Sequence, residues 1–150
     1  MPQSLACLII HVIFSTKYRA PVLGASIRPS LFAYLATCSR NAKCECYRVG
    51  GAADHVHLVI RLSRTITVAK LVEELKTASS KWMKRQSNEL SEFAWQVGYG
   101  AFSVSSTELG FLRRYIDNQE RHHRDNSFQD EYVRILVHHG VEYDERLLWD

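Results

Sequence analysis

The sequence has no apolar run long enough to span a bilayer, no CxxC cysteine pair, no Pro/Gly-rich linker and no internal repeat. The longest apolar run near the start, residues 8–14, is interrupted by His11 and follows no basic segment. It is far shorter than the roughly 20 residues of a membrane span. We therefore expect no membrane association, a single domain over residues 1–150 and a cytoplasmic location.

Four cysteines are present, and their spacing fits no zinc motif, because Cys44 and Cys46 are separated by one residue and no second pair exists. We expect all four to be buried or half-buried thiols in a reducing compartment. A metal role for Cys44 or Cys46 is the alternative.

The charge is unevenly distributed. Residues 1–126 carry 17 of the 19 Lys+Arg and 10 of the 16 Asp+Glu, whereas residues 127–150 carry 2 and 6. The chain is therefore a basic body followed by an acidic helical tail. A basic body favours a polyanionic partner, although solvated charge without any ligand would look the same.

The apolar pattern predicts four strands and four helices. Apolar, β-branched or alternating segments predict strands at residues 8–15, 44–49, 55–62 and 101–105. Three- and four-residue apolar spacing and capping residues predict helices at residues 29–41, from 67 onward, at 105–122 and at 127–140. The order β-α-β-β-α-β followed by helices predicts an α+β, ferredoxin-like (split βαβ) fold. This fold has an antiparallel four-stranded sheet with helices on one face, plus C-terminal helices.

Two segments contain candidate metal-ligating or catalytic residues. His55 and His57 alternate on a strand, so both imidazoles lie on one face and could hold one metal ion; two polar residues on a solvated face are the alternative. Tyr115 and Gln119 are four residues apart on a helix and share a face, beside its apolar stripe. An ordinary half-buried tyrosine would show the same spacing.

In this order, the two segments resemble the single-tyrosine HUH transposases of the insertion sequence 200/605 group, which include the REP-associated tyrosine transposases. Five stretches carry the resemblance over nearly the whole chain: VIFSTKYR at 12–19, GAADHVH at 51–57, WQVGYGAFSVS at 95–105, YIDNQE at 115–120 and YDER at 143–146.

The resemblance implies an enzyme that cleaves and rejoins single-stranded DNA at hairpins marking the ends of an element. Tyr115 would be the nucleophile and form a 5′-phosphotyrosine, while His55, His57 and Gln119 would hold Mg²⁺ or Mn²⁺. Two imidazoles would also accept Zn²⁺ or Ni²⁺. Activation of the phenol could come from the ion, from Arg114 or from His122, an accessory candidate.

The resemblance also implies a homodimer with composite active sites, and whether Tyr115 acts in its own chain or in the partner is open. Phosphates and unpaired bases of the DNA would be contacted by basic side chains. The candidates are Lys17, Arg19, Arg48, Lys76, Lys81, Lys84, Arg85 and Arg114.

Two alternatives to an active transposase remain. A domesticated nuclease of the same chemistry would process chromosomal repeats, and a lone gene among repeats would distinguish it from a mobile element. A non-catalytic nucleic-acid-binding module of the same fold would instead require exposed stacking aromatics on its sheet.

Overall fold

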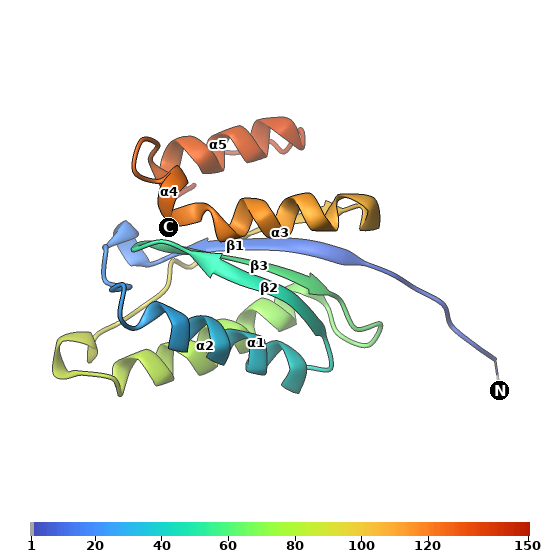
Figure 1. Ribbon diagram of the computed structural model, residues 1–150, viewed down its shortest axis with the longest axis horizontal. Helices are drawn as coiled ribbons and strands as arrows, with labels where there is room; N and C mark the ends of the chain where they lie inside the picture. Colours follow the sequence, from blue (N-terminus) through green and yellow to red (C-terminus); the bar gives the residue numbers. More distant parts are fainter. Residues whose placement is uncertain (1) are drawn as a thin grey trace.

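A four-stranded antiparallel sheet forms the centre of the computed structural model, which describes residues 2–150 (Figure 1). The strands are β1 (Ile9–Ser15), β2 (Glu45–Gly51), β3 (His55–Arg61) and β4 (Gly100–Val104), and their order in the sheet is β2-β3-β1-β4. The element order and this strand order confirm the predicted ferredoxin-like fold. Each predicted strand is found within about two residues of its expected bounds.

One face of the sheet is covered by two long helices, α1 (Arg28–Asn41) and α2 (Val68–Lys84), as Figure 1 shows. Alternate residues of the central strands, including Val12, Phe14, Val56 and Leu58, point to this side and form the larger hydrophobic core. The side chain of Thr67 caps α2 by accepting a hydrogen bond from the Lys70 backbone N–H. Short 3₁₀ helices follow β1 and α2, at Lys17–Arg19 and Asn88–Leu90.

The other face of the sheet is covered by the C-terminal helices, so the molecule has three layers (Figure 1). These helices are α3 (Leu109–Asp117), α4 (Gln119–His122) and α5 (Phe128–His138), and a 3₁₀ turn at Ser106–Glu108 precedes α3. Ile13 and Phe102 of the sheet pack against Phe128 and Tyr132 of α5. The acidic segment 127–150 therefore includes a helix that forms part of the core.

The predicted helix at residues 105–122 differs in detail from the structure. Ser105 caps a 3₁₀ turn through the backbone N–H of Thr107, and the regular helix begins only at Leu109. A second interruption falls at Asn118, whose φ of −94° and ψ of 10° lie outside the helical range and separate α3 from α4. By contrast, α5 begins at the predicted cap Ser127 and is followed by Gly140 at a φ of +66°, which suits glycine.

All four cysteines are free. Cys44 is buried and Cys38 and Cys46 are half-buried, as expected, but Cys7 is exposed because it lies in the extended segment before β1. Within residues 2–150, no helix combines the length and apolar character that crossing a membrane requires.

The close approach of β2 to α3 depends on Gly50. A methyl group there would lie 2.5 Å from Ile116 Cγ2 and 2.9 Å from the Ile116 carbonyl oxygen. We predict that Gly50→Ala lowers the free energy of unfolding by about 1–3 kcal/mol, because α3 must shift away from the sheet. Chemical denaturation measures this, and Gly24→Ala is the control because nothing lies within 4 Å of its added methyl group. Equal stability of the two variants would contradict the prediction.

Candidate active site

The two histidines of β3 lie on the sheet face that α3, α4 and α5 cover. His55 and His57 are both 0% exposed, so the prediction that they share a face is confirmed, whereas the solvated face of the alternative interpretation is not found. His55 Nδ1 is 2.7 Å from Asp54 Oδ1, and His57 Nδ1 is 2.7 Å from His11 Nε2. These contacts fix both rings and leave each Nε2 pointing toward the C-terminal helices.

The C-terminal helices bring Gln119 and Tyr115 to the same place. Gln119 is buried and its Oε1 lies 2.8 Å from His55 Nε2. The ring of Tyr115 is 6.0 Å from that of His57 between centroids. The four residues singled out in the sequence are therefore neighbours within one chain, despite the break at Asn118.

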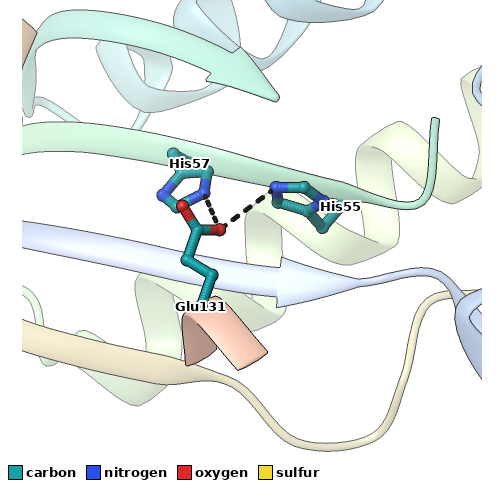
Figure 2. A group of neighbouring side chains, drawn as sticks. All are labelled: His55, His57 and Glu131. Carbon is teal, nitrogen blue, oxygen red and sulfur yellow. Dashed lines mark hydrogen bonds and ion pairs between the residues drawn. The ribbon is translucent and has the colours of Figure 1, made fainter. Parts of the chain in front are cut away.

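A fifth residue, Glu131 of α5, lies at the centre of this group and was not identified from the sequence. Figure 2 shows its carboxylate facing both histidines of β3. Glu131 Oε1 is 3.2 Å from His57 Nε2 and 3.6 Å from His55 Nε2, and the side chain is 2% exposed. The sequence does indicate that Glu131 is buried, because it lies three residues after Phe128 and four before Ile135, on the apolar face of its helix.

The second carboxylate oxygen of Glu131 faces the proposed nucleophile. Oε2 accepts hydrogen bonds from the Tyr115 hydroxyl and from Gln119 Nε2, the latter at 2.8 Å. Burial, the Glu131 charge and this hydrogen bond together raise the pKa of Tyr115 well above its usual range. The phenol is therefore a neutral hydrogen-bond donor in this arrangement, and its activation requires a cation or a proton acceptor nearby.

Two histidines of the α4 region complete the surroundings of Glu131. His123 Nε2 is 3.0 Å from Glu131 Oε1, and its Nδ1 is 2.7 Å from the Asn126 carbonyl oxygen. His122, the accessory candidate, is half-buried, with its Nε2 3.6 Å from Glu131 Oε2 and in no hydrogen bond. His122 also borders a cavity of about 330 Å³. Tyr115, Glu131 and His11 line the same cavity, which therefore adjoins the tyrosine.

The buried groups have strongly shifted proton affinities. Burial lowers the pKa of His57 to about 4 despite the favourable contact with Glu131, so this imidazole is neutral near pH 7. Burial alone would raise the pKa of Glu131, but hydrogen bonds from His123 and His57 outweigh it and hold the pKa far below the usual range. For His123 the interaction with Glu131 likewise outweighs burial and raises the pKa. The site thus combines a neutral imidazole with an ionised carboxylate.

The basic DNA-binding candidates are scattered over the molecule. Arg114 is exposed on α3 beside Tyr115, and Arg48 lies 3.4 Å from Asp117 at the end of the same helix. Lys17 and Arg19 follow β1, whose last residue pairs with His55. Lys81 and Lys84 are on α2, which covers the opposite face of the sheet, and Arg85 follows them.

Lys76 has a structural partner instead of a free charge. Its ammonium donates to the carbonyl oxygens of Gln96, Val97 and Gly98, at distances from 2.6 to 3.2 Å. These bonds fix the loop before β4 to α2. Burial lowers the pKa of Lys76 to about 8.

The chain matches the family model described as "Transposase IS200 like" over residues 4–119. This range includes His55, His57, Tyr115 and Gln119 and ends before Glu131. Because the match spans more than half of the chain, the protein belongs to the IS200-like transposase family, whose members are DNA-cleaving enzymes.

Two solved structures share the fold. A candidate transposase from Deinococcus radiodurans R1 has a TM-score of 0.63 and 24% identity, with 80% of this chain and 96% of that chain covered. A REP-associated tyrosine transposase bound to a REP hairpin has a TM-score of 0.52 and 13% identity, with 79% and 70% covered. No curated protein is significantly similar to the chain.

The burial of His11 and His57 predicts that the fold loses stability in mild acid. Both pKa values are lowered on folding, that of His57 to about 4, whereas an unfolded histidine titrates near 6.5. Below pH 6.5 the unfolded chain therefore binds more protons than the folded chain. The free energy of unfolding consequently decreases as the pH is lowered. The raised pKa of His123 acts in the opposite direction but involves one group instead of two.

We expect a net loss of about 1–3 kcal/mol between pH 7 and pH 5, measured by urea unfolding in EDTA. A His11→Gln variant removes one of the two groups and should lose less over the same interval. A stability that stays constant from pH 7 to pH 5 would show that the buried histidines do not act in this way.

Proposed function

We propose that this protein cleaves and rejoins single-stranded DNA at hairpin-marked element ends, with Tyr115 as the nucleophile. The observation that carries the proposal is the convergence of one tyrosine hydroxyl with His55, His57 and Gln119 in a single buried cluster. Family membership supports the reaction class, and the hairpin in the REP-associated structure supports the kind of substrate.

The cluster has the chemistry of a cation site. Asp54 accepts the Nδ1 proton of His55, so His55 Nε2 carries a lone pair and faces Gln119 Oε1 at 2.8 Å. Two lone pairs at hydrogen-bond distance repel unless a proton or a cation lies between them. His55, His57 and Gln119 would hold Mg²⁺ or Mn²⁺, which supplies Lewis-acid polarisation of the scissile phosphate when bound.

In the proposed step, Tyr115 Oη forms a bond to phosphorus while the bond from phosphorus to the 3′ oxygen breaks. The phenol proton passes, in the overall balance, to the leaving oxygen, which gives a 5′-phosphotyrosine and a free 3′-OH. A 3′-OH can later attack the phosphotyrosine and restore a phosphodiester and the tyrosine. The energy of the original bond is thereby conserved without a nucleotide cofactor.

The tyrosine and the histidines of one chain are already neighbours, which supports action of Tyr115 in its own chain. A homodimer with exchanged tyrosine helices stays a prediction from the family resemblance. Among the basic candidates, Arg114 and Arg48 lie nearest to the tyrosine helix and are the proposed phosphate contacts. Lys17 and Arg19 follow as contacts near the His55 end of the sheet.

The alternative of a non-catalytic sheet-face module has less support. The sheet face that would present stacking aromatics is covered by α3, α4 and α5, and its histidines are buried. A domesticated nuclease has the same cluster and the same chemistry, so the genomic surroundings distinguish it from a mobile element.

The first test concerns the nucleophile. A labelled single-stranded DNA hairpin incubated with the wild-type protein and Mg²⁺ or Mn²⁺ should give a covalent protein–DNA adduct on a denaturing gel. We predict that Tyr115→Phe and EDTA each abolish the adduct, whereas Tyr143→Phe, a matched loss of one hydroxyl elsewhere, leaves it unchanged. An adduct that persists in Tyr115→Phe, or forms equally in EDTA, would contradict the mechanism.

The second test separates catalysis from DNA binding. His57 is fully buried, so His57→Ala should abolish cleavage but leave the affinity for the hairpin nearly intact, as fluorescence anisotropy would measure. Circular dichroism of the variant checks that it is folded. A loss of hairpin binding by the folded variant would instead assign the histidines to DNA docking.

A further inference from the structure

The buried carboxylate of Glu131 lies outside the segment that matches the family model and has no permanent cation beside it. Within residues 2–150, its ion-pair partners within 4.0 Å are all histidines: His55, His57, His122 and His123. Buried charges are costly unless they are paired or bind a metal ion. Glu131 is 2% exposed, so its charge requires compensation within the cluster.

The hydrogen-bond directions around Glu131 place several lone pairs against one another. The Asn126 carbonyl can only accept, so His123 carries a proton on Nδ1. Its Nε2 donates to Glu131 Oε1 when the ring is protonated and carries a lone pair when the ring is neutral. This Nε2 faces Gln119 Oε1 and Glu131 Oε1, each at 3.0 Å. The Gln119 amide nitrogen donates to Glu131 Oε2, which turns the amide oxygen toward the same point.

The separations between these atoms are within a few tenths of an ångström of those of ligands around one ion. Two ligands each roughly 2.1 Å from an ion lie about 3.0–3.5 Å apart. Here Gln119 Oε1 is 2.8 Å from His55 Nε2, and Glu131 Oε1 is 3.2 Å from His57 Nε2 and 3.6 Å from His55 Nε2. His55, His57 and Glu131 together form one of the groups able to hold a metal ion.

We propose that Glu131 is a ligand of the divalent cation through Oε1, alongside His55, His57 and Gln119. The proposal deepens the proposed function and rests on it for the identity of the cation site. A carboxylate adds a negative charge and a hard oxygen to two imidazoles and an amide, which favours Mg²⁺ and Mn²⁺. The other oxygen of the same carboxylate accepts a hydrogen bond from the Tyr115 hydroxyl, so Glu131 also positions the nucleophile relative to the ion.

Direct metal binding tests this proposal without any DNA. Mn²⁺ is titrated into the full-length, metal-free protein, and free Mn²⁺ is followed by electron paramagnetic resonance. We expect Glu131→Gln, which keeps the size of the side chain, to weaken Mn²⁺ binding roughly 10- to 100-fold. Asp130→Asn is the matched control, because it removes the same charge from the adjacent, exposed residue and should bind Mn²⁺ as the wild type does.

A second variant separates ligation from packing. Glu131→Asp keeps the carboxylate on a shorter side chain and should bind Mn²⁺ more tightly than Glu131→Gln. Thermal unfolding in EDTA establishes that each variant is folded. Equal Mn²⁺ affinity in Glu131→Gln and the wild type, or no recovery in Glu131→Asp, would overturn the proposal.

The two proposals fail in different ways. If Mn²⁺ binding depends on Glu131 but the wild type gives no adduct with hairpin DNA, the ligand assignment stands and the proposed function fails. If the adduct forms and depends on Tyr115, while Glu131→Gln binds Mn²⁺ normally, the proposed function stands and the ligand assignment fails. Tyr115→Phe should bind Mn²⁺ as the wild type does, because the phenol is not a ligand.

Discussion

The charge of the nearly buried Glu131 carboxylate has to be compensated by neighbouring groups, and the arrangement of the C-terminal helices meets this constraint. Its two oxygens contact side chains from β3, α3 and α4, and Glu131 itself lies on α5. Each contact alone would fix only the position of α5 relative to one other element. Together they hold the tyrosine of α3 and the histidines of β3 at one point, although α4 is a single turn.

The sheet and half of the cluster could be predicted from local patterns. Side chains alternate across a strand, so the spacing of His55 and His57 fixed their common direction regardless of what covers them. Capping residues likewise predicted the start of α5 at Ser127 and its end near Gly140, because both depend on adjacent backbone groups. Such features require no knowledge of contacts distant in the sequence.

The rest of the cluster depends on contacts that no local pattern encodes. By its charge Glu131 belongs to the acidic tail, where a carboxylate is usually exposed, and only its place between Phe128 and Ile135 on the apolar face of α5 suggests burial. In the sequence His11 only interrupts an apolar strand, yet the register of β1 on β3 places it against His57. The break at Asn118 separates α3 from α4, and residue spacing alone cannot predict it.

The cluster takes its residues from the segment that matches the family model and from the later segment that holds Glu131. This division has a consequence for gene copies that are truncated at the 3′ end. The match to the family model ends at Gln119, whereas Glu131 is encoded downstream of it. A gene copy that has lost its 3′ end after this point would keep every residue that the family model matches. Its product would leave His57 and Tyr115 without their shared carboxylate, so intact signatures alone do not distinguish complete copies from remnants.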